Sequence, residues 1–328
     1  MNRNILVTGG AGAIGSNLVR KLLEEKNVTV VVIDDVSSGN FNHLDGLSNL
    51  VVVEGSIVDK NVLDEAFKYG INEVYHLAVN FANQNSVDNP EKDLMTNGIG
   101  TIKVLEASVV NKVEKFLLSS SSCVYRPADK PFAEEDDVEL TTPYAITKLL
   151  SEYYVCFFSK FHNLPSVIVR YFNNYGPGDI PGQFRGVVPN FMYQAMNNQP
   201  LTITGDGSET RPFTFVDDIV SGTVKAMGKG TKISPSFSGH PLEVDNNIVY
   251  NIGNDRSYTI LEFAETVNKV CNNSAGIEFL PKRNWDMFPK RAVNNDKARG
   301  ELGFDITYNL TDGLKLTYDW FKKQNFKL

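Results

Sequence analysis

A glycine-rich turn near the amino terminus constrains the fold of this chain most. An apolar run over residues 4–8 leads into residues 9–15, which have the spacing Gly-x-x-Gly-x-x-Gly, and a helical pattern follows. Strand, glycine turn and helix in this order form the context that a dinucleotide fingerprint requires. Gly9 would permit the tight turn, Gly12 would let the backbone approach a pyrophosphate, and Gly15 would let the helix pack on the strand. These residues therefore predict a dinucleotide site.

A carboxylate at the end of the next strand indicates which dinucleotide is bound. The strand expected over residues 28–33 ends at Asp34 and Asp35, about 20 residues past the glycines. A carboxylate at this place suits a ribose 2′-hydroxyl and repels a 2′-phosphate. The pattern therefore favours NAD over NADP.

Strand and helix patterns alternate through the first half of the chain. Such alternation predicts an α/β fold with a right-handed, doubly wound parallel sheet of the Rossmann type. Strands are expected at residues 50–53, 73–78, 116–118 and 167–171, and helices at 61–69 and 90–110. Beyond residue 175 we expect strands at 201–203 and 213–215, a loop over 229–247, and helices after 217, at 259–271 and at 310–322. Residues 1–175 are thus predicted to form an NAD-binding domain to which the chain crosses back later, and residues 176–328 mainly a smaller α/β substrate-binding lobe.

Candidate catalytic side chains lie at a helix start and at a strand end. Tyr144 and Lys148 open an apolar-periodic helix after Pro143, and their i, i+4 spacing puts phenol and ammonium on one face. The lysine would favour the phenolate, and a nearby cationic cofactor would favour it further, so that the pair could accept a proton near neutral pH. Residues 119–123 (Ser-Ser-Ser-Ser-Cys) end a strand at the carboxyl edge, where ligands of open α/β sheets bind. His76 lies inside a strand pattern and is predicted to be a core histidine.

Charge and cysteine content narrow the classes of partner. The formal net charge of the 328 residues is −7 and there is no basic block, which disfavours nucleic-acid binding. The three cysteines are widely spaced, so neither a disulfide framework nor a metal site is expected. The amino terminus lacks a signal-peptide pattern and no apolar run reaches membrane-spanning length. A cytoplasmic protein without membrane contact is expected.

The same motifs resemble those of a known family. Besides residues 8–15 and the acidic strand end, they include Asn97 in Asn-x-x-Gly-Thr, Ser121 before Val-Tyr, Tyr144 with Lys148, residues 170–173 (Arg-Tyr-Phe-Asn), residues 210–218, and Arg283 with Asp286. In this order they resemble the extended short-chain dehydrogenase/reductase family, specifically its NAD-dependent nucleotide-sugar epimerases and dehydratases, with UDP-glucose 4-epimerase-like proteins the most similar.

The resemblance implies a role for each matching residue. Tyr144 would be the acid and base at a sugar hydroxyl, Lys148 would depress its pKa, and Ser121 would fix the hydroxyl; these three would be catalytic. NAD contacts are implied at Gly9, Gly12, Ala13, Ile14, Gly15, Asp34, Asp35, Ser56, Ile57, Leu77, Ala78, Asn97, Ser119, Tyr144, Lys148 and Tyr171. Nucleotide-sugar contacts are implied at Ser121, Tyr144, Asn173, Arg185, Asn190, Arg211, Arg283 and Asp286.

Residues 122 and 123 discriminate between branches of that family. Its 4,6-dehydratases place Asp-Glu where this chain has Ser122-Cys123, and its glucuronate decarboxylases place Glu at Cys123. The resemblance therefore implies epimerisation at C4 through a 4-keto intermediate, on UDP-glucose/galactose, an N-acetylhexosamine or a uronic acid. A 3,5-epimerase or 4-ketosugar reductase using Cys123, and a catalytically silent NAD-binding regulator, stay open. We interpret Cys123 as a small buried thiol.

Two further features leave alternatives open. Arg185 and Arg291 are cations beyond those that a diphosphate needs, and either would suit a sugar carboxylate, a phosphate or solvent. Aromatic side chains at residues 153–161 exceed what one buried stripe requires. By resemblance, a homodimer that pairs helix 90–110 with the Tyr144 helix in a four-helix bundle is expected, although core packing would also explain these aromatics.

Overall fold

The computed structural model describes residues 3–81, 83–230, 244–281, 290–324 and 326. Its centre is a seven-stranded parallel sheet in the order β11-β6-β5-β4-β1-β2-β3. The strands are β1 (Arg3–Thr8), β2 (Val28–Asp34), β3 (Leu50–Glu54), β4 (Glu73–His76), β5 (Lys115–Ser121), β6 (Ser166–Tyr171) and β11 (Val249–Ile252). The predicted Rossmann-type sheet is confirmed. Because the strand order reverses between β1 and β4, a crevice is expected at the carboxyl ends of these strands.

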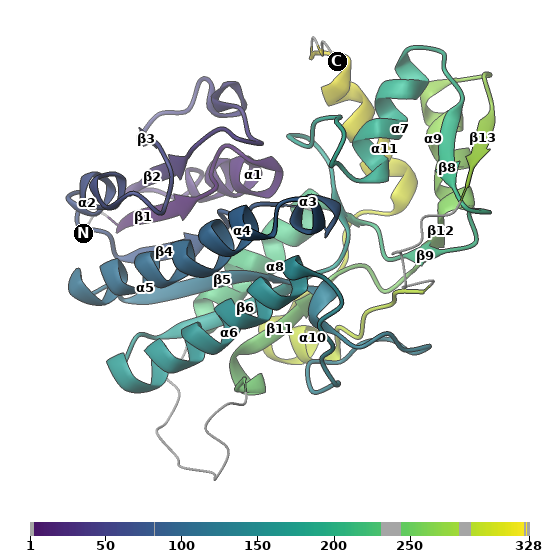
Figure 1. Ribbon diagram of the computed structural model, residues 1–328. Helices are drawn as coiled ribbons and strands as arrows, with labels where there is room; N and C mark the ends of the chain where they lie inside the picture. The colour runs from purple at the N-terminus through teal and green to yellow at the C-terminus, as the bar shows by residue number, and fades with distance from the viewer. Residues whose placement is uncertain (1–2, 82, 231–243, 282–289, 325, 327–328) are drawn as a thin grey trace.

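Helices cover both faces of the sheet (Figure 1). Both faces need covering because both are apolar. Successive side chains of a strand point to opposite faces, and Ile5 and Leu6 of β1 belong to two different buried clusters. One face is covered by α1 (Ala13–Leu22) and α8 (Val216–Lys229), and the other by α2 (Lys60–Phe67), α5 (Thr101–Val110) and α6 (Pro143–His162). Short helices η1 (Phe41–Leu44), η3 (Ser122–Val124), η4 (Asn246–Ile248) and α3 (Asn83–Asp88) lie in the connections.

The helix predicted over residues 90–110 is not α-helical throughout. It begins as α4 (Pro90–Asp93), continues as the π-helical η2 (Leu94–Gly100) and ends as α5. A Cβ on Gly100 would come within 2.5 Å of Ile57 Cδ1, so the helix approaches the segment after β3 closely. Hydrophobic periodicity does not reveal a π turn, and such turns are frequent at functional sites.

The second half of the chain builds a smaller lobe and also returns to the large sheet. Its elements are β7 (Asn174–Tyr175), α7 (Val187–Met196), β8 (Leu201–Thr204), β9 (Thr210–Arg211), β10 (Thr214–Phe215), β12 (Tyr258–Thr259), α9 (Ile260–Cys271), β13 (Ile277–Leu280), α10 (Asp296–Leu302) and α11 (Leu310–Phe321). The expected strands near 201 and 213 and the three later helices are confirmed within a few residues. The expected loop at 229–247 lies mostly outside the described residues.

The edge strand β11 was not predicted, because a polar residue interrupts its apolar run. Asn251 is completely buried in this strand, and its amide donates to the Phe132 carbonyl at 3.0 Å and accepts from the Tyr125 hydroxyl at 2.7 Å. These tertiary contacts offset the low strand propensity of asparagine. With α8, this strand puts part of the second half of the chain in the dinucleotide domain.

One hydrophobic core runs from the sheet into the smaller lobe. It joins Val7 of β1 to Phe191 of α7, Phe263 of α9 and Leu314 of α11. The two parts therefore pack as one body around the space between them. No helix in the described ranges is both long enough and apolar enough to span a bilayer.

Candidate active site

A cavity of about 870 Å³ lies between the carboxyl edge of the sheet and the smaller lobe. Its volume suits a cofactor with a substrate. Among the predicted site residues it is lined by Gly9, Gly12, Ala13, Ile14, Gly15, Asp34, Asp35, Ser56, Ile57, Leu77, Ala78, Ser119, Ser121, Tyr144, Lys148, Tyr171, Asn173, Arg185, Asn190 and Arg211. Arg283 and Asp286 lie outside the described residues. The sheet edge therefore brings together side chains and turns that are far apart in the sequence.

The glycine turn has the shape that a pyrophosphate requires. A Cβ on Gly15 would lie 2.1 Å from the Gly9 carbonyl oxygen, whereas a Cβ on Gly12 would meet only that oxygen, at 3.3 Å. Gly15 is thus fixed by packing, and Gly12 faces the cavity. The first turn of α1 carries no acidic residue and no side chain caps it, so its backbone N–H groups can bind an anion. These residues fit a dinucleotide.

Asp34 braces this turn as well as ending β2. Its carboxylate accepts hydrogen bonds from the backbone N–H of Ala11 at 2.9 Å and of Val36 at 2.8 Å. Burial raises the pKa of the Asp34 carboxyl, and the two N–H donors partly offset that effect. Asp35 lines the cavity beside it.

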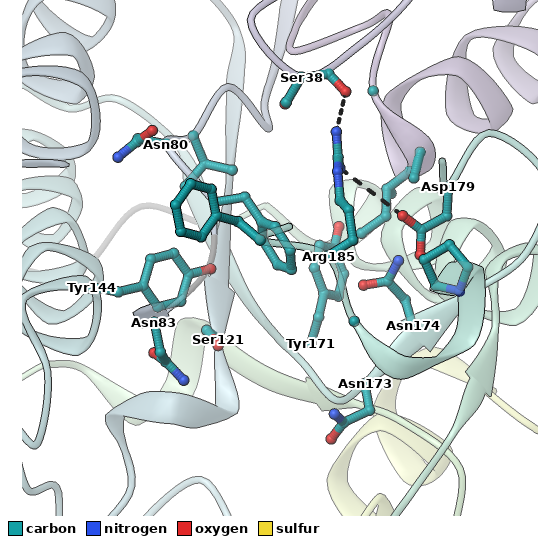
Figure 2. A pocket seen from close by; sticks show the side chains of 18 of the residues that line it. Ser38, Asn80, Asn83, Ser121, Tyr144, Tyr171, Asn173, Asn174, Asp179 and Arg185 are labelled. Atoms are coloured by element: carbon teal, nitrogen blue, oxygen red, sulfur yellow. Dashed lines mark hydrogen bonds and ion pairs between the residues drawn. The ribbon is translucent and has the colours of Figure 1, made fainter. Parts of the chain in front are cut away.

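The predicted catalytic residues come together from β5 and α6. Thr142 caps α6 by accepting from the Ala145 N–H at 3.2 Å, and Pro143 fixes the first turn, so Tyr144 and Lys148 share the face that meets the strand end. Figure 2 shows the Tyr144 phenol directed into the cavity near Ser121. The Lys148 ammonium donates to the Ser119 carbonyl at 2.8 Å and lies 5.8 Å from the Tyr144 ring centre.

The expected low pKa of Tyr144 does not follow from these protein groups. Burial raises the pKa of this phenol, Cys123 raises it further, and the Ser121 hydrogen bond only partly counteracts them. Burial also lowers the pKa of Lys148 to about 8. The surrounding protein groups thus leave the pKa of the phenol raised when no cofactor is bound. That Lys148, together with a cationic cofactor nearby, makes Tyr144 a proton acceptor near neutral pH stays a prediction.

Asn97 lies behind the cavity wall and is not among the residues that line it. Its carbonyl oxygen accepts from the Asn80 backbone N–H at 2.7 Å, and its amide donates to Asp93 at 2.9 Å and Thr147 at 3.2 Å. The structure therefore places Asn97 in a network that connects the π-helical η2 to α6. It supports the wall segment at Asn80, and its direct contact with the cofactor stays a prediction.

His76 is a core histidine, as the strand pattern predicted. The Thr8 hydroxyl lies 2.7 Å from its Nδ1, and the Thr101 hydroxyl lies 2.9 Å from its Nε2. Burial lowers its pKa to about 3, so the ring is neutral near neutral pH.

Asn173 lines the cavity with a side chain whose hydrogen-bonding capacity is not fully used by the described residues. It follows β6 with a left-handed φ of 30°, and its buried Oδ1 has no hydrogen-bond partner within the part of the chain that the structure describes. A strained backbone with an unsatisfied carbonyl is typical of a binding position. Asn190, by contrast, uses its amide to hold the loop at Gly182, with bonds of 2.9 and 3.2 Å.

Arg185 bridges the two sides of the cavity mouth. Its guanidinium donates to the Ser38 carbonyl and lies 4.0 Å from the Asp179 carboxylate (Figure 2). Burial raises the pKa of Asp179 to about 7, and Arg185 acts in the opposite direction. Arg185 is thus engaged by protein groups from both sides. Sequence reasoning missed Ser38 and Asp179, because only the fold brings these two loops together.

We expect Gly12→Val to weaken NAD binding about tenfold or more while leaving the fold intact, because the added side chain fills the space where the pyrophosphate approaches. Titration of the cofactor-free protein with NAD, followed by calorimetry, measures this. Gly46→Val is the control, since no atom lies within 4 Å of an added Cβ there and Gly46 does not line the cavity. Because Gly46 has a φ of +76°, some loss of stability is expected in the control, but no loss of affinity.

The strand order, the glycine turn and the Ser121–Tyr144–Lys148 group at one sheet edge define an enzyme of the short-chain dehydrogenase/reductase class. The chain belongs to the NAD dependent epimerase/dehydratase family, whose model matches residues 5–253. NAD is accordingly its cofactor, and nucleotide-sugar epimerase/dehydratase chemistry is its general activity.

Similar proteins include both epimerases and decarboxylases. A UDP-N-acetyl-alpha-D-glucosaminuronate decarboxylase of Bacillus cytotoxicus is 31% identical over 98% of this chain and 99% of its own. Among solved structures, an epimerase of Methanothermobacter thermautotrophicus is 42% identical with a TM-score of 0.89, covering 98% of this chain and 93% of its own. The UDP-glucose 4-epimerase of Thermotoga maritima, solved with UDP-glucose, is 33% identical with a TM-score of 0.88, covering 98% and 99%.

Proposed function

We propose that the chain epimerises a nucleotide-diphosphate sugar at C4, with a UDP-hexose, UDP-N-acetylhexosamine or UDP-uronate as substrate. The observation that carries the proposal is the composition of the catalytic end of the cavity. Ser121 and Tyr144 meet there beside Lys148, while the following positions, Ser122 and Cys123, provide no carboxylate. A hydroxyl can be deprotonated and reprotonated at such a site, whereas a strong acid for a leaving hydroxyl is missing from that strand end.

Each of the three residues has a distinct task. The Tyr144 oxygen takes the proton of the sugar C4 hydroxyl and later returns it. The Ser121 hydroxyl, which hydrogen-bonds the same phenol, orients that hydroxyl. Lys148, held on the Ser119 carbonyl, contributes positive charge to the phenol and donors to a bound ribose. NAD, when bound, supplies the hydride acceptor and donor, and its positive nicotinamide ring favours the phenolate that the protein groups alone do not stabilise.

Asn173 lines the cavity, and its side-chain carbonyl has no hydrogen-bond partner among the described residues. We infer that Asn173, through its side-chain N–H, and Arg211, both lining the cavity on the side of the smaller lobe, bind the diphosphate and leave the sugar free to turn. Turning exposes the other face of the C4 carbon, which inversion requires.

Decarboxylation is the second candidate, because relatives of both kinds cover nearly the whole chain. The family resemblance implies that glucuronate decarboxylases carry a glutamate at the position that corresponds to Cys123 of this chain. That difference supports epimerisation.

Purified protein incubated with UDP-, dTDP- and GDP-sugars, without added cofactor, tests the proposal by NMR of the products. The panel includes glucose, N-acetylglucosamine and glucuronate forms. Inversion at C4 with no loss of water or carbon dioxide is the expected result. Release of carbon dioxide from UDP-glucuronate or its N-acetyl analogue would overturn the proposal in favour of decarboxylation.

We also propose that two copies associate through the helices that cover one face of the sheet. Exposed apolar side chains lie on η2 and α5 (Leu94, Met95, Val110) and on the adjacent α6 (Ile146, Phe157, Phe161). These helices run side by side at the molecular surface (Figure 1). An apolar surface of this extent favours burial against a second copy. Light scattering is expected to give a dimer for the native chain and a monomer for Phe157→Glu; a native monomer would refute the pairing.

A further inference from the structure

Residues 177–186 lie between β7 and α7, and their first residues are tied to the start of α1. The Asn17 side chain of α1 donates to the Pro177 carbonyl at 2.8 Å. Gly178 has a φ of +88°, and a Cβ there would lie 3.2 Å from the Cα of Ala13. Glycine permits both this backbone conformation and this close approach. One end of the segment is therefore fixed beside the glycine turn.

The other end of the segment reaches the loop that follows β2. The Arg185 guanidinium donates to the Ser38 backbone carbonyl, 147 positions away in the chain. That loop is itself fixed to the glycine turn, because the Asn40 backbone N–H donates to the Ala11 carbonyl at 3.1 Å. His43 Nδ1 lies 3.1 Å from the same oxygen. Arg185 thus contacts a part of the dinucleotide domain that is anchored at the glycine turn.

Contacts inside the segment keep Arg185 in place. Its guanidinium lies 4.0 Å from the Asp179 carboxylate, and the two side chains are only 16% and 15% exposed. The Arg185 backbone N–H donates to the Gly182 carbonyl at 3.2 Å, and the Asn190 side chain bonds both the N–H and the carbonyl of Gly182. A segment braced in this way has little conformational freedom left to lose when a ligand binds beneath it.

The segment and the glycine turn line the same cavity. Gly12, Asp35 and Ser38 line it from the dinucleotide domain, and Asp179 and Arg185 line it from the segment. Figure 2 shows the Arg185 side chain extended between Ser38 and Asp179. Because the segment is fastened at α1 and at the loop after β2, it spans the dinucleotide end of the cavity between two anchors.

We propose that residues 177–186 form a strap that retains bound NAD, with Arg185 as its clasp on Ser38. The proposal assigns Arg185 to the cofactor, whereas the family resemblance implies a contact with the nucleotide sugar. It concerns NAD alone and does not depend on which sugar carbon is inverted. Release of NAD past the strap requires that the bond at Ser38 or the bond at Pro177 opens first. Retention suits the proposed reaction, in which the hydride leaves the sugar and returns to it at one site.

Exchange of labelled NAD tests the strap without any sugar substrate. Protein loaded with radiolabelled NAD is mixed with excess unlabelled NAD, and the label that stays bound is followed by rapid filtration. Arg185→Met should raise the release rate about tenfold or more, because a hydrogen bond donated by a charged group is lost. Arg126→Met is the control and should release NAD at the native rate, because Arg126 pairs with the exposed Asp137 and Glu139 and does not line the cavity.

Asn17→Ala separates a strap from a direct contact between Arg185 and NAD. Asn17 does not line the cavity, so the variant acts on the cofactor through the Pro177 anchor. Its second bond, to the Ala13 carbonyl, lies within α1, where alanine is a strong helix former. We expect release to become about two- to tenfold faster, the range for one neutral hydrogen bond. Faster release in Arg185→Met with native release in Asn17→Ala would overturn the strap in favour of a direct contact.

Binding of UDP distinguishes the strap from the nucleotide-sugar contact that the resemblance implies. Calorimetry of the NAD-loaded protein with UDP is expected to give the same affinity for Arg185→Met as for the native chain. If Arg185→Met instead releases NAD at the native rate and binds UDP about tenfold more weakly, Arg185 is a substrate contact and the proposal is wrong. Neither measurement needs turnover, so a failure of C4 inversion would refute the proposed function and leave the strap standing.

Discussion

Tyr144→Phe is expected to lower the rate of C4 inversion by about 10²–10⁴-fold, the range for loss of a positioned acid–base group. The substitution removes only the phenolic oxygen, which lies in the cavity near Ser121. The ring keeps its packing against Cys123 and Ala145, so the fold and the binding of NAD should persist. Single-turnover rates under saturating substrate measure the chemical step directly.

The control for this change is Tyr153→Phe on the same helix. Tyr153 packs against a different buried cluster and does not line the cavity, so its hydroxyl has no part in the proposed chemistry. Its rate should stay within about twofold of the native rate, since most substitutions away from a site change little. If Tyr144→Phe retains nearly native single-turnover rates, another group takes the C4 proton, and the assignment of Tyr144 is wrong.

Much of the cofactor end could be predicted from sequence because its signals are local. The glycine turn and Asp34 stand within 35 residues of the amino terminus, and adjacent strands carry them to one edge. The same reasoning predicted Ser121 at a strand end and Tyr144 at a helix start, since parallel strands put their carboxyl ends together.

The parts that were missed depend on contacts between distant segments. Arg291 and Cys123 are 168 positions apart, and no local pattern indicates that they meet. The bridge from Arg185 to Ser38 spans 147 positions. The burial that raises the pKa of Tyr144 could not be predicted for a related reason: spacing shows that a lysine is near, whereas the depth of burial depends on the complete fold.

A buried ion pair beneath the active site is a further product of distant contacts. Arg170 of β6 and Glu152 of α6 are almost completely buried and form two parallel bonds of 2.9 and 2.7 Å. The Ser120 hydroxyl donates to the same carboxylate at 2.5 Å, and Arg170 donates to the Tyr125 hydroxyl at 2.9 Å. The pair thereby connects α6 to the end of β5, on which Ser121 lies.

Glu152→Gln is therefore expected to lower the free energy of unfolding by about 3–5 kcal/mol, because it leaves the Arg170 guanidinium buried without a charged partner. That is a large part of a total stability of about 5–15 kcal/mol. Urea unfolding followed by circular dichroism measures the change. Glu65→Gln is the matched control: its partner Lys68 is exposed, so the loss should be within about 0.5 kcal/mol. Equal losses in the two variants would show that water reaches Arg170, and would refute the pair as the link between helix and strand.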